Sequence, residues 1–413
     1  MIITDSFLKE IPKVDLHLHL DGSLRLHTLI ELAQKNNVAL PFYDEANLLQ
    51  HVFREKYEDL WSYLQCFQYT CAVMQKADDL TRIAYELAQD CIAEGIRYIE
   101  VRFAPQLHMT ELSFDEVLIA VNTGLQRAQD EFLQNDSVVV HKEPPFYYGI
   151  ICSALRMFDE NTSGWYGAFY KNFDEPNPKK VFAYASLELA RNAVRCKETL
   201  KIPIVGLDLA GNEDGFPAKD HREAFMYAHQ YFMRNTIHAG EAYNARSIFE
   251  ALTHVHADRI GHGYFIFDRD KLELEEKLFL EEINMAASDF IEGLVNYISE
   301  RRITIEVCVS SNLQTQPEKG ILDHPIWDML EKRMSIVICT DNRLMSNTSV
   351  CKEMRLLHES RPNKFGLEQI KRSCIYGFKR SFLQLPYVEK RAYVRQCIDF
   401  LEQVIEKHKM LQQ

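Results

Sequence analysis

The chain has 413 residues, of which 60 are Asp or Glu and 47 are Lys or Arg, so its formal net charge is −13 with neutral histidine. This acidic balance, without any run rich in Lys or Arg, argues against a protein that binds nucleic-acid phosphates. Hydrophobic residues at 46% and charged residues at 26% are typical of a globular protein and exclude a disordered or fibrous one.

The ends and cysteines of the chain indicate its compartment. The first residues, MIITDSFLKEIPKVD, lack the cationic start and apolar stretch of a signal peptide. The sequence has no run of the ~18 apolar residues that span a membrane. Ten cysteines are scattered from Cys66 to Cys397 without a CxxC pair, which is typical of reduced structural thiols. We expect a cytoplasmic protein with no membrane or nucleic-acid partner, and the sequence leaves its oligomeric state open.

Eight short runs rich in Val, Ile and aromatic residues predict strands, because each ends in small or polar residues and precedes a helical pattern. They are residues 13–20, 96–105, 147–155, 204–211, 235–241, 258–263, 302–311 and 334–342.

The segments between these runs carry helix signals. In DDLTRIAYELAQDCIAEG one apolar face is repeated at helical spacing, and we expect Asp78 or Asp79 to cap the start and Gly95 to end the helix. Between the fifth and sixth runs, residues 248–255 again place apolar side chains at helical spacing.

Eight strands that alternate with helices predict an α/β fold, a closed parallel (β/α)8 barrel of the TIM type. Such a barrel usually needs ~250 residues, so the surplus has to lie in insertions. We expect extra helices after strand 1, within residues 24–94, a charged insertion at 268–299, and extra helices at the C-terminus beyond residue 363. No Gly/Ser-rich or Pro-rich linker occurs, so residues 1–413 are expected to form a single domain.

Two histidines lie at the end of the first predicted strand. In a barrel we expect aliphatic side chains in the interior and chemistry at the carboxyl ends of the strands. The first run ends in VDLHLHLDGS, where the alternation of a strand places His17 and His19 on the same face. An HxH pair is weak alone, since His254 and His256 form a second one away from any strand end.

Other polar residues follow three further strands. The fifth run ends at His238 and Glu241, the sixth at His262, and the eighth at Asp341 and Asn342. Each of them alone could cap a helix or bond a loop. Together with the first strand they bring three histidines and an aspartate to one end of the barrel.

This set, His17, His19, His238 and Asp341, suits a first-row divalent metal, and zinc is the natural choice for three imidazoles and one carboxylate. Such an ion lowers the pKa of a bound water toward ~7, which favours hydrolysis. Beside it, His262 can take a proton from the water and Glu241 can protonate the group under attack. The fourth strand ends in LAGNE without a lysine, so a single metal ion is favoured over a lysine-bridged pair.

The motifs HLHLDGSL, YIEVRFAPQ, LDLAGNE, HAGEA, DRIGHG, SSN and TDN, in this order, resemble the adenosine deaminase family of the amidohydrolase superfamily, over residues 13–354. The resemblance implies one Zn²⁺ per chain, held by His17, His19, His238 and Asp341. It also implies that Asp341 touches the attacking hydroxide.

The resemblance assigns further roles by position. Glu241 corresponds to the acid that protonates purine N1, and His262 to the base and orienter of the hydroxide. Asp21 corresponds to the acceptor of the ribose hydroxyl, and the Gly211 N–H to the donor to purine N3.

The chain departs from the family at Asn342, where an aspartate is commoner. An asparagine amide can donate to purine N7 at any pH. The expected catalytic residues are thus Glu241, His262 and Asp341, and the expected substrate contacts are His19, Asp21, Gly211 and Asn342.

The implied activity is zinc-dependent hydrolytic deamination of adenosine and 2′-deoxyadenosine to inosine or deoxyinosine and ammonia, in purine salvage, with a small nucleoside as substrate. Adenine and aminodeoxyfutalosine deaminases of this group usually show Glu where this chain has Asp21, and we identify no phosphate site for AMP. Two alternatives stay open: a deaminase of another 6-aminopurine (adenine, aminodeoxyfutalosine or a modified adenosine), and a non-catalytic barrel that binds a ligand.

Overall fold

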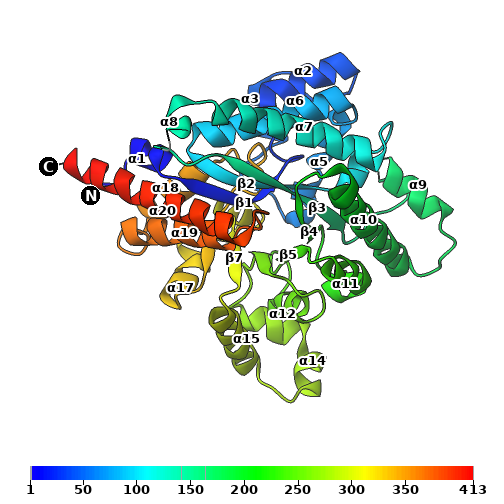
Figure 1. Cartoon of the computed structure of the whole chain (residues 1–413). Helices are drawn as coiled ribbons and strands as arrows, with labels where there is room; N and C mark the ends of the chain where they lie inside the picture. Colours follow the sequence, from blue (N-terminus) through cyan, green and yellow to red (C-terminus); the bar gives the residue numbers. More distant parts are fainter. Residues whose placement is uncertain (1, 141, 163, 413) are drawn as a thin grey trace.

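A computed structural model describes residues 2–140, 142–162 and 164–412 (Figure 1). Eight parallel strands pair in chain order, from β1 to β8. Each strand overlaps one of the eight predicted runs. The strands are β1 Lys13–His19, β2 Ile96–Phe103, β3 Tyr147–Leu155, β4 Ile204–Ala210, β5 Arg234–Ala239, β6 Arg259–His262, β7 Thr304–Val307 and β8 Ile336–Ile338.

The two outer strands of this sheet meet and close it. Leu18 in β1 bridges Asp341, which lies just beyond β8. The His19 N–H donates to the Asp341 carbonyl at 2.8 Å, and the Asp341 N–H donates to the His17 carbonyl at 2.8 Å. The fold is therefore a (β/α)8 TIM-type barrel, as predicted.

Helices surround the barrel and fill its insertions. In the first half of the chain they are α1 Asp5–Glu10, α2 Leu26–Asn36, α3 Glu45–His51, α4 Leu60–Leu64, α5 Phe67–Val73, α6 Ala77–Ala93, α7 Phe114–Leu133, α8 Asp136–Val139, α9 Trp165–Asn172 and α10 Pro178–Leu200, with a 3₁₀ turn η1 Pro105–His108. In the second half they are α11 Arg222–Gln230, α12 Ala245–Thr253, α13 Arg269–Glu275, α14 Lys277–Glu282, α15 Ala287–Arg301, α16 Val309–Gln314, α17 Ile326–Glu331, α18 Val350–Ser360, α19 Leu367–Arg380 and α20 Tyr387–Met410, with η2 Ala218–His221 and η3 Ile321–Asp323.

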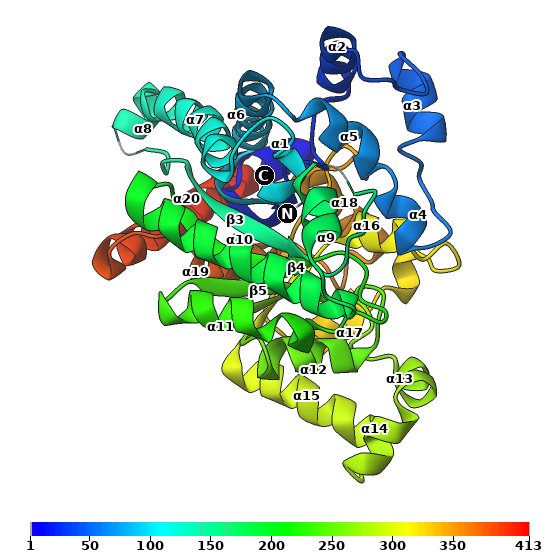
Figure 2. The same cartoon turned by 90° about the vertical axis from the view of Figure 1, so that its right-hand side faces the viewer.

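The predicted insertions are helical. Helices α2 to α5 follow β1, and α13 and α14 precede α15; Figure 2 shows both groups along the right-hand side of the molecule. Beyond residue 363, α19 packs against β1 and β8 and covers the seam where the barrel closes, and α20 packs against α19 (Figure 1). Helix α12 is the predicted connection between the fifth and sixth strands.

The start of α6 differs from the prediction. The helix follows Lys76, so Asp78 and Asp79 lie inside its first turn and neither is the cap. Negative charge in a first turn still stabilises a helix through its dipole. Asp79 instead accepts hydrogen bonds from Lys35 Nζ at 2.6 Å and Asn36 Nδ2 at 2.7 Å, which join the end of α2 to the start of α6.

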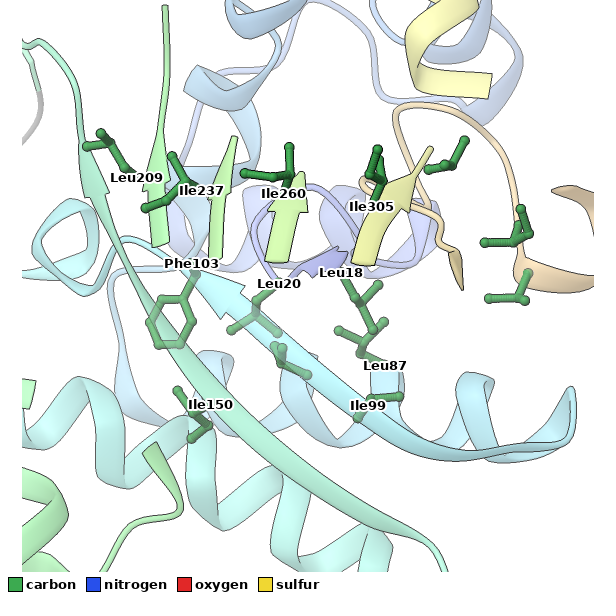
Figure 3. Close-up of a cluster of buried hydrophobic side chains, with 14 of the residues drawn as sticks. Leu18, Leu20, Leu87, Ile99, Phe103, Ile150, Leu209, Ile237, Ile260 and Ile305 are labelled. Carbon is green, nitrogen blue, oxygen red and sulfur yellow. The ribbon is translucent and has the colours of Figure 1, made fainter. Parts of the chain in front are cut away.

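The strands turn an apolar face to the surrounding helices, because successive side chains alternate across the barrel wall. Leu18, Leu209, Ile237, Ile260 and Ile305 belong to this buried core (Figure 3). The alternate positions, among them those of His17 and His238, face the inside of the barrel.

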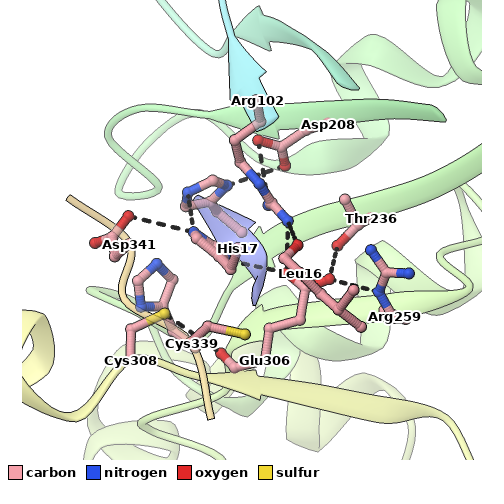
Figure 4. Close-up of polar contacts among 12 residues, drawn as sticks. Leu16, His17, Arg102, Asp208, Thr236, Arg259, Glu306, Cys308, Cys339 and Asp341 are labelled. Carbon is pink, nitrogen blue, oxygen red and sulfur yellow. Dashed lines mark hydrogen bonds and ion pairs between the residues drawn. The ribbon is translucent and has the colours of Figure 1, made fainter. Parts of the chain in front are cut away.

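The inside of the barrel carries charge. Arg102 Nη2 donates to Glu306 Oε2 at 2.9 Å, and Arg102 Nη1 lies 3.6 Å from Asp208 Oδ2 (Figure 4). Arg259 Nε donates to Glu306 Oε1 at 2.6 Å and its Nη2 pairs with Glu100. The expectation of an aliphatic interior is therefore wrong in this region. Buried carboxylates need such cationic partners, since an unpaired buried charge is costly.

Two further features concern the whole chain. All ten cysteines are buried, and none is bonded to another. None of the helices in the described ranges combines the length and apolar character that a membrane-spanning helix requires.

Candidate active site

Four side chains predicted to bind metal converge at the carboxyl ends of β1, β5 and β8. His17 Nε2 and His19 Nε2 each lie 3.1 Å from His238 Nε2 and 3.4 Å from Asp341 Oδ1. Donor atoms that hold one tetrahedral zinc at ~2.0–2.1 Å would lie ~3.3 Å from one another. The spacing of these four atoms therefore fits a single ion of this size.

Carboxylates behind two of the histidines fix where their hydrogens lie. Nδ1 of His17 donates to Glu306 Oε2 at 2.8 Å (Figure 4). Nδ1 of His238 donates to Asp208 Oδ1 at 3.0 Å. A neutral imidazole has one hydrogen, so each Nε2 is left with a lone pair. Two lone pairs 3.1 Å apart repel each other unless a cation lies between them. The donor set thus fits a metal ion by its chemistry as well as by its spacing.

The backbone is strained at two of the site residues. His262 has φ of +65° and Asp341 has φ of +61°, in the left-handed region that residues with a side chain rarely adopt. Such strain is common where a side chain must be aimed at a site. Ser311 Oγ also donates to Asp341 Oδ2 at 2.6 Å, which leaves Oδ1 directed at the histidines.

Glu241 is buried beside His262. It follows β5, and its Oε1 lies 3.5 Å from His262 Nε2. Burial raises the pKa of Glu241 well above its usual range, and the negative charges of Asp341 and Glu213 raise it further. This environment favours the protonated form of the carboxyl group. Glu213 fixes the loop by accepting N–H groups of residues 241–243 at 2.8 to 3.4 Å.

A chain of hydrogen bonds sets the tautomer of His262. The Ile326 N–H donates to His324 Nδ1 at 3.1 Å. Burial lowers the pKa of His324 to about 3, so its single hydrogen is on Nε2, which lies 3.4 Å from Asn312 Oδ1. The Asn312 amide nitrogen thus donates to His262 Nδ1 at 3.0 Å. Burial keeps the pKa of His262 well below its usual value, so the neutral ring carries its hydrogen on Nε2.

The residues predicted to contact substrate line one pocket of about 620 Å³, together with the predicted metal ligands His238 and Asp341; His17 lies behind this lining. Asp21 Oδ1 is buried without a hydrogen-bond partner among the described residues, and burial raises the pKa of Asp21 to about 7. Gly211 follows β4 with φ of +99°. Asn342 Nδ2 donates to the Tyr63 hydroxyl at 2.8 Å, and His19 lies beside Asp21. The structure therefore brings all the sequence-predicted site residues together.

The insertion after β1 supplies the apolar part of this pocket through α4 and α5, and the loop after β3 supplies Phe158. The acidic side chains in the lining are Asp21, Asp159, Glu241 and Asp341. Among the lining residues, all of which belong to the described part of the chain, none is Lys or Arg.

The sequence reasoning gave no role to the residues that support the site. Asp208, Glu213 and Asn312 lie within LDLAGNE and SSN, and Glu306 lies in β7. These supporting residues could have been noticed in the sequence because each is a polar residue inside or shortly after an apolar strand. The second HxH pair, at residues 254 and 256, joins none of the possible metal clusters found in the described ranges.

Comparisons of the sequence agree with this geometry. The family model for adenosine deaminase matches residues 12–142 and 181–399. The adenosine deaminase of Mycobacterium avium is 33% identical over 401 residues, which cover 95% of each chain. A probable adenosine deaminase of Dictyostelium discoideum is 33% identical over 386 residues, 93% of this chain, and the match spans only 42% of that longer protein.

Solved structures share the fold at lower identity. An amidohydrolase from Burkholderia ambifaria with bound Zn has a TM-score of 0.73 and 21% identity, covering 98% of this chain and 96% of its own. An N6-mAMP deaminase from Arabidopsis has a TM-score of 0.71 and 21% identity, covering 95% of this chain and 99% of its own. An adenine deaminase from Arthrobacter aurescens has a TM-score of 0.71 and 20% identity, with coverage of 95% and 99%. Together with the site geometry, the family match over most of its length and the near-full-length relatives show that the chain belongs to the adenosine deaminase family.

Proposed function

We propose that the protein is a zinc-dependent deaminase that converts adenosine and 2′-deoxyadenosine to inosine or deoxyinosine and ammonia, a reaction of purine salvage. The observation that carries this proposal is the buried cluster in which Glu241, a neutral His262 and the four-residue ligand set meet beside one pocket. The names of the relatives support the same substrate.

The charge of the pocket favours a nucleoside over a nucleotide. A phosphate on the ribose would enter a pocket whose lining includes neither Lys nor Arg, so its charge would be buried without a cationic partner. Free adenine would leave the buried Asp21 carboxylate without the hydroxyl that we expect it to bind, and an unpaired buried polar group costs affinity. AMP, N6-mAMP and adenine are therefore expected to be poorer substrates.

In the proposed reaction, Glu241 transfers the protons and four other residues hold the metal ion. A zinc ion held by His17, His19, His238 and Asp341 would supply Lewis acidity, which makes water a nucleophile at neutral pH. Glu241 gives its proton to purine N1 while the water oxygen attacks C6, so the ring accepts electrons at that nitrogen. The bond between C6 and the amino group then breaks. Of the two protons of the water, one leaves with the amino group as ammonia and the other restores Glu241.

His262 orients the attacking oxygen in this scheme. Its Nε2 is buried and has no hydrogen-bond partner among the described residues, and the Asn312 hydrogen bond keeps the ring hydrogen on that atom. A neutral ring with this tautomer donates to the attacking oxygen. The geometry thus supports the orienting part of the role expected from the sequence.

Metal analysis and ammonia release test the proposal together. Purified protein should contain about one zinc ion per chain and release ammonia from adenosine, and His238→Ala should lose both metal and activity. His254→Ala, which changes the other HxH pair, is the matched control and should keep both. Full metal content and normal turnover in His238→Ala would contradict the ligand assignment.

A further inference from the structure

A second cavity of about 1160 Å³ lies at the opposite end of the barrel from the candidate active site. Its lining includes Arg234 and Arg259, the first residues of β5 and β6, and Arg302, which precedes β7. The ends of α15 and α19 and the first half of α20 complete the wall (Figure 1). The candidate active site, in contrast, is built at the carboxyl ends of the strands.

The lining of this cavity is strongly basic. It contains nine Lys or Arg side chains and one acidic residue, Asp258, although the whole chain carries 60 acidic residues against 47 basic ones. Although the protein as a whole is acidic, the electrostatic potential inside this cavity is therefore positive. That potential attracts anions.

Most of these cations lack a protein counter-ion. Arg259 is neutralised by Glu100 and Glu306, Arg234 by Asp258 at 2.7 Å, and Arg395 by Asp399 at 2.9 Å. The other six have no ion pair among the described residues: Arg301, Arg302, Lys379, Arg380, Lys390 and Arg391. Arg301 and Arg302 lie at the end of α15 and directly after it, and the other four lie on α19 and α20.

Lys390 shows the electrostatic cost of this arrangement. Burial lowers the pKa of its ammonium group, and although Glu100 raises it, the positive charges of Arg234 and Arg259 lower it further. Its Nζ reaches only the Ser381 carbonyl, at 2.6 Å. An anion in the cavity would relieve the repulsion among these like charges.

Aromatic side chains complete the wall. Phe232 is 90% exposed and has φ of +56°, a conformation that is rare for a residue with a side chain. Tyr387 is 73% exposed and Tyr297 is 41% exposed. Exposed rings beside cations are a surface on which a nucleobase can stack.

We propose that this cavity binds a nucleoside triphosphate, with the phosphates among the six uncompensated cations and the base against Phe232, Tyr387 or Tyr297. Its volume is close to the ~300–1,000 Å³ usual for small-molecule sites. A longer polyanion would extend beyond the cavity over a surface whose net charge is negative, which disfavours nucleic acid.

Calorimetric titration of the zinc-loaded full chain with Mg·GTP tests this proposal, since guanine has no 6-amino group and so is no substrate for the deaminase. We expect saturable binding that weakens as salt rises. Arg301→Glu combined with Arg391→Glu should weaken the binding at least tenfold, because the change reverses an exposed charge on α15 and another on α20. Arg191→Glu with Arg222→Glu alters the net charge equally at exposed residues that do not line the cavity, and it should leave the affinity unchanged.

A second experiment tests whether the cavity recognises the nucleoside part of a nucleotide or only its phosphates. Phe232→Ser with Tyr387→Ser should weaken Mg·GTP at least fivefold and leave Mg·tripolyphosphate unchanged. Absence of saturable binding by either probe at millimolar concentration would overturn the proposal, as would an equal loss in the Arg191/Arg222 control. Mg·GTP that binds no tighter than Mg·tripolyphosphate and is indifferent to the aromatic changes would overturn the nucleotide assignment. Retained adenosine turnover in each variant shows that it is folded.

Discussion

The neighbours of each residue in the candidate site determine its protonation state or tautomer. Glu241 offers a proton because burial and two neighbouring carboxylates disfavour its charged form. His17 and His238 offer lone pairs because carboxylates hold their other hydrogens. His262 offers an N–H because of Asn312. Each assignment gives a separate expectation for mutation.

Glu241→Gln should keep zinc and fold and lose most of kcat, since removal of a positioned general acid typically costs ~10² to 10⁴ in rate. Glutamine has nearly the shape of the carboxylic acid but no acidic proton. Steady-state kinetics and metal analysis check this expectation, with Glu292→Gln on the exposed face of α15 as the control. A kcat within a few-fold of the parent would assign the proton to another group.

Asn312→Asp should lower kcat by ~10², the usual effect of removing one oriented donor near the reacting oxygen, with little change in KM. An aspartate accepts a hydrogen bond from His262 Nδ1, so the ring hydrogen leaves Nε2. Asn296→Asp makes the same chemical change on the surface of α15 and should have no effect. If the Asn312 variant turns over adenosine at the parent rate with the same KM, the tautomer of His262 does not matter to the reaction.

At the scale of elements, α19 covers the seam between β1 and β8 where the barrel closes. It packs on β1 and β8, and Gly377 lets it approach them closely. A Cβ at that position would lie 2.2 Å from Val14 Cγ2 and 3.1 Å from Val337 Cγ2. The absence of a side chain there is therefore part of how the ring closes.

Gly377→Ala should lower the free energy of unfolding by about 1 to 3 kcal/mol, the usual cost of overpacking. Gly293→Ala in α15 is the matched control, because nothing lies within 4 Å of its added Cβ, and it should stabilise the protein by up to ~1 kcal/mol. Thermal denaturation of both variants measures the difference. Equal Tm values would mean that α19 can move away from the strands at no cost.

The sequence predicted those elements whose signal is local. All eight strands could be predicted because apolar runs bounded by polar residues identify buried parallel strands. The proximity of the candidate site residues could be predicted because their histidines and carboxylates follow those runs directly. The interior ion pairs were not foreseen, since Arg102, Glu306 and Asp208 meet only when distant strands are placed side by side. The contact of Asn312 with His324 depends in the same way on tertiary structure. The predicted cap of α6 was wrong because an aspartate is common both at the N-cap and in the first turn of a helix. The sequence alone does not distinguish these two positions for Asp78 and Asp79.

At the scale of the whole molecule, we propose that the chain is a single cooperative unit. One buried core cluster contains residues from Phe7 to Ile405, and the two ends of the chain also meet, since Gln412 bonds both the N–H and the carbonyl of Ile2. The ligands of the proposed zinc ion come from strands far apart in sequence, so the ion would bind only the folded chain.

Calorimetric unfolding should show one transition, and removal of zinc by a chelator should lower its Tm by several degrees. A ligand present at a hundredfold excess over its Kd stabilises the folded state by about 2.7 kcal/mol. His238→Ala should show the lower Tm with or without chelator. Two separated transitions would contradict the single unit, and a Tm that does not respond to the chelator in the parent protein would contradict the metal site.

A comparison of kcat/KM for adenosine, AMP, N6-methyl-AMP and adenine by the zinc-loaded protein tests the central claim most directly. A phosphate dianion would have to enter a pocket whose lining contains no Lys or Arg, and burying a charge without a cationic partner is costly. We predict that adenosine is deaminated with a kcat/KM at least ~10² above that of either nucleotide, and that adenine is also poor because it cannot satisfy Asp21. Faster ammonia release from AMP, N6-methyl-AMP or adenine than from adenosine, or none from any of the four, would contradict the account.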